Sequence, residues 1–246
     1  MKAYYSENRL VNLSDVDYNG FLSPYSIFRY FEDVATTHAT ILGVGYQNMI
    51  KNNLFWVAIK TIVKINSFPS ISDNVIVETF PSEPNKLRCD RFYNIYDFKG
   101  DLLISAKTEW TVINFITKRP EQIRSIYPTN VEYELDKPRI ENEFSRYESN
   151  IDGYNPLFKY RVKSTDIDLG KHLNNAEYIR IVLSSYKTQD LDKYNIKMME
   201  INYKSAAYEK EELTFYKKED GLNDLFIALN SDNKIVINMI ISKEKK

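Results

Sequence analysis

Four polar residues lie close together in the second half of the chain: Asp168, His172, Asn174 and Asn175. A histidine side chain has an unperturbed pKa of about 6.5, which suits proton transfer near neutral pH. Asp168 precedes His172 by four residues and could orient the imidazole or stabilise its protonated form. Asn174 and Asn175 open a predicted helix, whose free backbone N–H groups could face a developing oxyanion. The spacing indicates a candidate site for acid–base catalysis.

The same residues also have a purely structural interpretation. Asp166 and Asp168 are good turn formers, Asn174 is a common helix N-cap, and His172 could be a surface residue. The spacing alone leaves both interpretations open.

The turn that carries these residues has a counterpart in the first half of the chain. An offset of 151 residues places like residues together: Asp15 with Asp166, Asp17 with Asp168, Ser14 with Thr165, Leu22 with Leu173 and Arg29 with Arg180. A repeat this long indicates two fused copies of one domain. His172 corresponds to Phe21, so only the second copy has an ionisable group at this position. The two copies have therefore specialised.

A helix and a meander of strands must position the first turn. Ser23 and Pro24 are a typical N-cap and first helical residue, and an apolar stripe follows at helical spacing until Gly43. Four strand-like runs come next: WVAIKTIVKI from Trp56, NVIVETF from Asn74, KLRCDRFYNIYDF from Lys86 and LLISAKTEWTVIN from Leu102. An antiparallel sheet curled around one long helix would bury both faces of this pattern.

The second half repeats this order of elements after a connector. Residues 116–155 contain prolines and many charges and are predicted to link an N-terminal domain, 1–115, to a C-terminal domain, 156–246. The elements expected in the second half are LFKYRV from Leu157, the turn STDIDLGK, a helix from Asn174 to about Ser185, and strands at KMMEINYKS, ELTFYKK, DLFIALN and KIVINMII. The predicted fold class is α+β.

Composition narrows the function classes. The chain has 246 residues and 43% hydrophobic content, enough for a real core. Its 33 Lys and Arg nearly balance 34 Asp and Glu, so no basic field attracts nucleic acid. It has no signal peptide and no apolar stretch of about 20 residues, which predicts a cytoplasmic protein without a membrane partner. With one cysteine and two histidines, neither a disulfide nor a metal or other cofactor is expected.

Other reactive residues have structural interpretations. His38 lies on the apolar stripe of the first helix and is expected to be packed and hydrogen-bonded. Cys89 lies on an alternating strand with no histidine near it in sequence, so a small half-buried residue is expected there. Lys118, Arg119 and Arg124 form a basic cluster that could meet an acidic partner, although short charge runs are usually solvated.

Two motifs resemble a known family. DIDLGKHLNNAEYI resembles the DxNxHxNN-x-x-Y motif of the acyl-ACP thioesterases of plants and bacteria, and FEDVATTHATILGVG resembles their QxxAxxHxxxLGxG stretch. Three further segments follow that family in order: LFWVAIKTIVKI, VETFPSEPNKLRCDRFYNIYDFKG and SAKTEWTVINFITKRP. The resemblance implies a tandem hotdog fold, in which each half is a curved antiparallel sheet around a long helix. It also implies hydrolysis of fatty acyl-ACP thioesters in fatty acid biosynthesis.

The resemblance assigns the candidate site residue by residue. Asp168 matches the motif Asp, His172 matches the motif His, and Asn174 and Asn175 match the pair that starts the helix. These four are the candidate catalytic residues.

Two positions depart from the family pattern. The motif Asn between Asp168 and His172 is Gly170 here, and the family's catalytic Glu falls at Ala206 within YKSAAYE. The chain thus lacks an amide that could bind the thioester or water and a carboxylate that could activate water. Glu209 could substitute for that carboxylate, although a solvated glutamate is the commoner state.

The leading hypothesis is an acyl-ACP thioesterase with acyl carrier protein as its partner, acting as a monomer or homodimer. Its acyl chain would lie in an apolar tunnel lined mainly by the first half. Gly170 and Ala206 favour an alternative, a protein that binds acyl thioesters with weak or no hydrolysis. A hotdog hydratase would also use His and Asp, but the resemblance over nearly the whole chain is to thioesterases.

Overall fold

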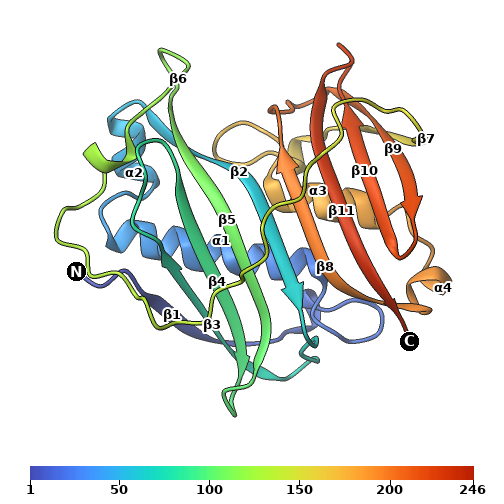
Figure 1. Ribbon diagram of the computed structural model, residues 1–246, viewed down its shortest axis with the longest axis horizontal. Coiled ribbons are helices and arrows are strands. Elements are labelled where there is room, and N and C mark those ends of the chain that lie inside the picture. Colours follow the sequence, from blue (N-terminus) through green and yellow to red (C-terminus); the bar gives the residue numbers. More distant parts are fainter. The chain divides into compact units, whose positions relative to one another are not determined.

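A computed structural model describes all residues from 1 to 246 and divides the chain into two compact units. The first unit is Met1–Asn142 and the second is Glu143–Lys246. Each consists of an antiparallel sheet with one main helix against a face of that sheet (Figure 1). None of the helices is both long and apolar enough to cross a membrane.

The first unit contains one long helix among its strands. Its elements are β1 (Tyr5–Leu10), α1 (Pro24–Ile41), α2 (Tyr46–Lys51), β2 (Leu54–Ile65), β3 (Asn74–Pro81), β4 (Cys89–Asp97), β5 (Leu102–Asn114) and the short β6 (Arg119–Pro120). The sheet order is β1-β3-β4-β5-β2, and β6 pairs with β5. Every pair is antiparallel, as the meander pattern predicts.

Helix α1 begins where the sequence predicts. The hydroxyl of Ser23 accepts a hydrogen bond from the backbone N–H of Ser26, and Pro24 is the first of 18 helical residues. The apolar stripe of α1 is buried against the sheet, where the ring of Phe31 packs on that of Tyr93 from β4, with centroids 4.8 Å apart. This contact joins helix to sheet in the core of the first unit.

The second unit repeats the arrangement with a shorter helix. Its elements are β7 (Asn155–Arg161), α3 (Asn175–Leu183), α4 (Thr188–Leu191), β8 (Tyr194–Tyr203), β9 (Glu212–Asp220), β10 (Asn223–Leu229) and β11 (Ile235–Lys245). The sheet order is β8-β11-β10-β9-β7, again antiparallel throughout. The helix expected from Asn174 to about Ser185 is confirmed, with Asn174 as its N-cap and Ser184 as its C-cap.

Strand β1 was not predicted from its own residues. The segment YSENRL alternates in burial but is mostly polar, as is usual for an edge strand that pairs only with β3. The repeat offset of 151 residues carries Tyr5–Leu10 onto residues 156–161, which lie within β7. The internal repeat therefore contained the signal for β1.

The segment expected to link the two halves is shared between the units. Its first part packs on the first unit, where Lys137 forms an ion pair of 2.9 Å with the buried carboxylate of Glu78. Its second part packs on the second unit, where Ser145 and Tyr147 both donate hydrogen bonds to the buried carboxylate of Glu200. A buried glutamate in each unit thus binds that unit's share of the segment.

His38 is packed and hydrogen-bonded, as expected. Its side chain is fully buried, and Nη1 of Arg91 donates to its Nδ1 over 3.0 Å. Its Nε2 lies 3.4 Å from the carbonyl oxygen of Lys2. Burial, and next the charge of Arg91, lower the pKa of His38 to about 4. The ring is therefore neutral at physiological pH.

This neutral histidine predicts a pH dependence of stability. An unfolded chain would bind a proton at His38 near pH 6.5, whereas the folded chain binds it only near pH 4. Between these values the unfolded state holds more protons, so the free energy of unfolding should fall as pH drops, by up to about 3 kcal/mol. Denaturant titrations between pH 4 and 7 measure this. His38→Gln, which cannot titrate, should flatten the profile, and an equally steep profile in that variant would contradict the assignment.

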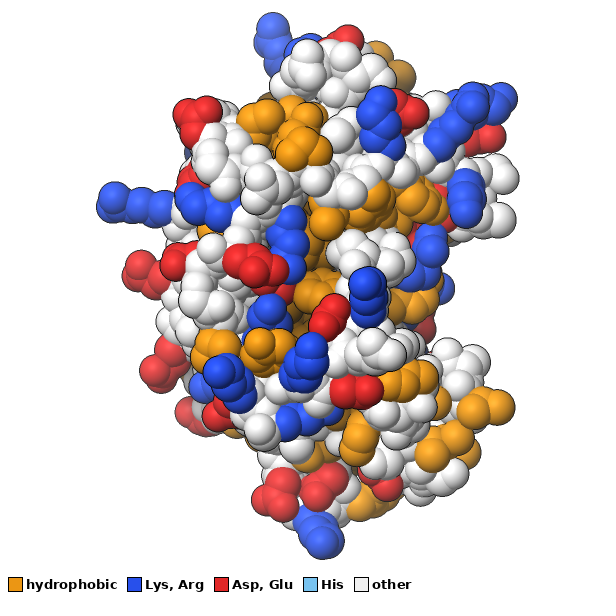
Figure 2. Space-filling model, turned by 90° about the vertical axis from the view of Figure 1, so that its right-hand side faces the viewer, with side chains coloured by type: hydrophobic (Ala, Val, Ile, Leu, Met, Phe, Trp, Pro, Cys, Tyr) orange, Lys and Arg blue, Asp and Glu red, His pale blue; other side chains and the backbone are white.

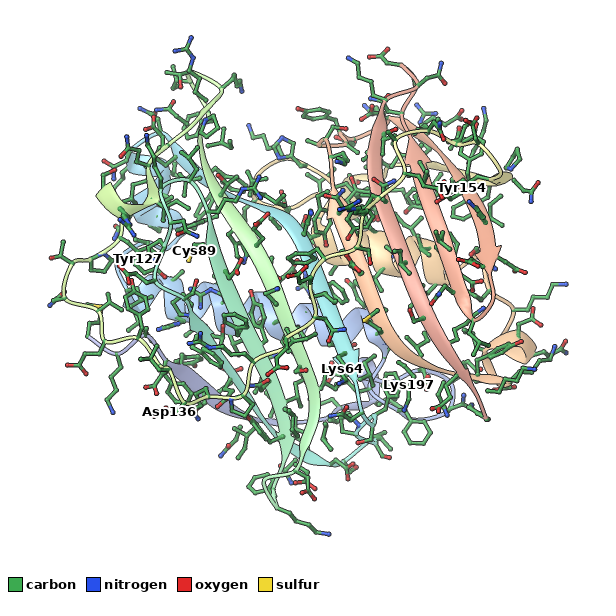
Figure 3. All side chains as sticks on the ribbon, in the orientation of Figure 1. Lys64, Cys89, Tyr127, Asp136, Tyr154 and Lys197 are labelled. Carbon is green, nitrogen blue, oxygen red and sulfur yellow. The ribbon has the colours of Figure 1, made fainter.

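Cys89 belongs to an apolar cluster in the first unit rather than to a reactive site. The cluster consists of Leu42, Val44, Met49, Leu54, Cys89, Val112, Ile123 and Tyr127, with Trp56 packed against it. Figure 3 shows Cys89 and Tyr127 near one another. Burial raises the pKa of the Cys89 thiol to about 12, so the sulfur stays protonated and is a poor nucleophile.

The basic cluster lies on the surface. Lys118, Arg119 and Arg124 are all exposed, and Nε of Arg124 donates to the carbonyl oxygen of Pro84 over 2.9 Å. Figure 2 shows one face of the molecule, on which basic and acidic side chains are interspersed, as the balanced composition predicts. Contact between the cluster and an acidic partner stays a prediction.

Candidate active site

The candidate residues lie on a tight turn between β7 and α3. The backbone N–H of Asp168 donates to the carbonyl of His172 over 2.9 Å, and the N–H of Lys171 donates back to the carbonyl of Asp168 over 3.0 Å. Lys171 has a φ of 62°, in the left-handed region that side chains other than glycine rarely adopt. The turn therefore closes at Lys171 and presents His172 just before the helix.

The carboxylate of Asp168 holds this turn together. Its Oδ1 accepts hydrogen bonds from the backbone N–H of Gly170 over 2.7 Å and of His172 over 3.3 Å. Such side-chain contacts to the next amides are typical of aspartate in turns. Asp168 thus fixes the backbone from which the His172 side chain projects.

The first unit contains the same turn without the histidine. Oδ1 of Asp17 accepts from the N–H groups of Asn19 and Phe21 over 2.9 and 3.2 Å. The N–H of Asp17 donates to the carbonyl of Phe21 over 2.8 Å, and Gly20 has the left-handed φ of 79°. The internal repeat is confirmed at the level of single hydrogen bonds, and Gly20 of the first turn is Lys171 in the second.

Asp166 anchors the turn to the helix. Its side chain is buried and accepts hydrogen bonds from the hydroxyl of Tyr160 over 2.8 Å and from the N–H of Lys163 over 2.8 Å. Nη2 of Arg180, one turn before the end of α3, forms an ion pair with it over 3.0 Å. The carbonyl of Asp166 also accepts from the N–H of Asn174 over 2.9 Å. Sequence reasoning paired Arg180 with Arg29 but did not predict its bond to Asp166.

Asn174 and Asn175 begin the helix as predicted. The side-chain oxygen of Asn174 accepts from the N–H of Ala176 over 2.8 Å, which makes Asn174 the N-cap of α3. Asn175 is the first helical residue, and both side chains are half-buried. The first N–H groups of a helix have no partner within it and carry the positive end of the helix dipole. The cap uses the N–H of Ala176, whereas the N–H of Asn175 lies at this positive end of the helix, three residues after His172.

The imidazole of His172 contacts the ring of Tyr208. The two ring centroids are 5.1 Å apart, with planes inclined by 67° in an edge-to-face arrangement. His172 is half-buried, whereas 54% of Tyr208 is exposed. Nothing in the sequence pattern indicates this contact, because Tyr208 comes from the segment after β8 and the motif covers only the turn.

The segment after β8 runs beside the turn. The carbonyl of Ala207 accepts a hydrogen bond from the N–H of Leu173 over 2.8 Å. This bond brings Ala206, the residue before Ala207, close to the candidate site. Ala206 and Glu209 are both exposed. The position where the family resemblance expects a carboxylate is thus near the turn but carries only a methyl group.

Comparisons with known proteins agree over nearly the whole chain. The sequence profile of the acyl-ACP thioesterase N-terminal domain matches residues 2–127, and that of the acyl-ACP thioesterase C-terminal domain matches residues 152–243. A palmitoyl-acyl carrier protein thioesterase of Arabidopsis thaliana is 27% identical over 200 residues, which cover 73% of this chain and 46% of that protein. The chain spans about half the length of the first curated relatives it matches.

Solved structures show the same fold. An acyl-ACP thioesterase from Bacteroides thetaiotaomicron superposes with a TM-score of 0.87 at 21% identity and covers 98% of both chains. A 12:0-ACP thioesterase from Umbellularia californica superposes with a TM-score of 0.80 at 17% identity, covering 99% of this chain and 98% of the other. With a matching profile for each unit, the chain belongs to the acyl-ACP thioesterase family.

Proposed function

We propose that this chain hydrolyses fatty acyl-ACP thioesters and releases free fatty acid and holo-ACP, as an enzyme of lipid metabolism. The observation that carries the proposal is the turn at Asp168, which places His172 directly before the N-terminus of α3 in a member of this family. The proposed architecture is a tandem hotdog, with domains at 1–115 and 156–246 joined by residues 116–155. The similar superposed structures support it.

In the proposed mechanism His172 acts as general base. Its imidazole removes a proton from a water molecule, and the water oxygen forms a bond to the thioester carbonyl carbon. The negative charge moves to the carbonyl oxygen, which accepts a hydrogen bond from the backbone N–H of Asn175, the first residue of the helix that Asn174 caps. When the tetrahedral intermediate collapses, the C–S bond breaks and the leaving sulfur takes the proton from His172.

Asp168 acts in this mechanism through the backbone. Its Oδ1 binds the N–H groups of Gly170 and His172, which fixes the direction in which the imidazole leaves the chain. Asp166 and Arg180 hold the other side of the turn on α3. The chemistry therefore rests on one histidine carried by a rigid turn, because neither Gly170 nor Ala206 supplies the polar group found at that position in the family motif.

The second candidate function is binding of acyl thioesters with weak or no hydrolysis. Gly170 and Ala206 favour it, because each replaces a polar group of the family site. Native mass spectrometry distinguishes the two functions: a binding protein would retain an acyl ligand after incubation, and an enzyme would yield free fatty acid.

The direct test is release of free thiol from acyl-ACPs of several chain lengths by the purified protein. We expect release well above the spontaneous rate for at least one length. Absence of release at every length would exclude the proposed hydrolysis, and acyl-CoA substrates in parallel would show which carrier is preferred. The cytoplasmic location and the monomeric or homodimeric state stay predictions.

A further inference from the structure

The turn alone does not fix the imidazole of His172. The Asp168 carboxylate binds backbone N–H groups, and the first turn uses Asp17 in the same way beside Phe21, a residue with no imidazole to orient. The backbone is thus held equally in both copies. The side-chain torsions of His172 need a separate restraint if the ring is to hold one orientation.

Tyr208 supplies a contact of that kind. Its ring meets the His172 ring edge to face, with centroids 5.1 Å apart, within the range in which aromatic pairs attract. More than half of Tyr208 is exposed, at 54%, so burial in the core does not explain its position.

The backbone beside Tyr208 is fixed on both sides. Its own N–H donates to the carboxylate of Glu211 over 2.9 Å, and the carbonyl of the preceding Ala207 accepts from the N–H of Leu173 over 2.8 Å. The second bond ties the Tyr208 segment to the residue next to His172. The two rings are therefore carried by backbone segments that are hydrogen-bonded to each other.

We propose that Tyr208 is a positioning residue for His172, which holds the imidazole in its working orientation through ring contact. The inference rests on the proposed function, because the orientation matters only if His172 transfers a proton. The contact also lies two residues from Ala206, so an aromatic side chain restrains the histidine in a segment that lacks the family carboxylate.

Two substitutions distinguish the role of the Tyr208 ring from that of its hydroxyl. Tyr208→Phe keeps the ring and should leave kcat within about twofold, whereas Tyr208→Ala should lower kcat by about 10- to 100-fold with KM nearly unchanged. The pH profile of kcat should keep its shape while its plateau falls. Leu169→Ala is a matched control, because Leu169 is an apolar side chain on the same turn and is 73% exposed. It should leave kcat and KM unchanged.

Histidine NMR provides a readout that does not depend on activity. The chain has only two histidines, so the imidazole resonance that remains in the His38→Gln variant belongs to His172. Tyr208→Ala should shift this resonance by removing the ring current, and Tyr208→Phe should preserve it. If the His172 resonance did not shift in Tyr208→Ala, or if kcat were unchanged in that variant, the role of Tyr208 would be excluded but the proposed function would not. Absence of thiol release by the wild-type protein would instead remove the proposed function.

Discussion

His172→Ala should lower thiol release from acyl-ACP by at least about 10³-fold. The imidazole is the only group on the turn that can take a proton from water near neutral pH, and general acid–base catalysis contributes about 10²- to 10⁴-fold. No other histidine can replace it, because His38 is fully buried in the first unit and bound to Arg91. Single-turnover assays with wild-type and variant protein at equal acyl-ACP concentrations measure the effect.

The first unit offers a matched control for this experiment. Phe21 occupies the equivalent position on an equivalent turn, and Phe21→Ala should leave thiol release nearly unchanged. The hydrogen bonds of both turns involve backbone groups and Asp side chains, so neither substitution should alter the fold, which circular dichroism can verify. If His172→Ala retained activity within tenfold of the wild type, His172 could not be the general base.

Gly170→Asn combined with Ala206→Glu should raise thiol release by at least about 10²-fold. The pair restores the amide and the carboxylate of the family motif, and polar groups placed at a developing charge typically contribute about 10² to 10³ each in rate. Both positions can accept the new side chains. Asn19 occupies the equivalent of position 170 in the first turn with the same hydrogen bond to aspartate, and Ala206 is exposed.

The two single substitutions and a variant that lacks His172 serve as controls for this prediction. Each single change should give a smaller gain than the pair, and the pair should give no gain in a chain that also carries His172→Ala. A double variant with unchanged release, but with the wild-type fold, would show that this chain no longer uses the family chemistry. Native mass spectrometry of that variant would then reveal whether it still retains acyl groups.

Local patterns predicted much of the fold. The Ser23–Pro24 start of α1 and the Asn174 cap of α3 depend on adjacent residues, so the sequence contains them in full. The residues of β1 do not predict a strand, because most of them are polar and the alternation of buried and exposed positions leaves no hydrophobic pattern. The repeat with β7 does indicate a strand there. Boundaries that depend on packing, such as the division of the linker at 142 and 143, have no local signal.

The sequence predicts where the candidate site lies, but not which residues of other elements contact it. The motif locates Asp168 and His172 on one turn, and the structure brings them together through the backbone. The bond of Asp166 to Arg180 and the ring contact of Tyr208 join residues from separate elements, and no periodicity or spacing rule relates them. Asp17 makes the same backbone contacts beside Phe21 as Asp168 makes beside His172, so these contacts do not require a histidine.

The matched turns have an evolutionary consequence. Because Asp17 and Asp168 hold their turns through main-chain N–H groups, these hydrogen bonds do not depend on which side chain occupies position 21 or 172. A duplicated chain of this kind can exchange the residue at this position in one copy without losing the hydrogen bonds that close the turn. One copy of the turn can therefore acquire a reactive side chain during evolution while the other copy keeps a purely structural role.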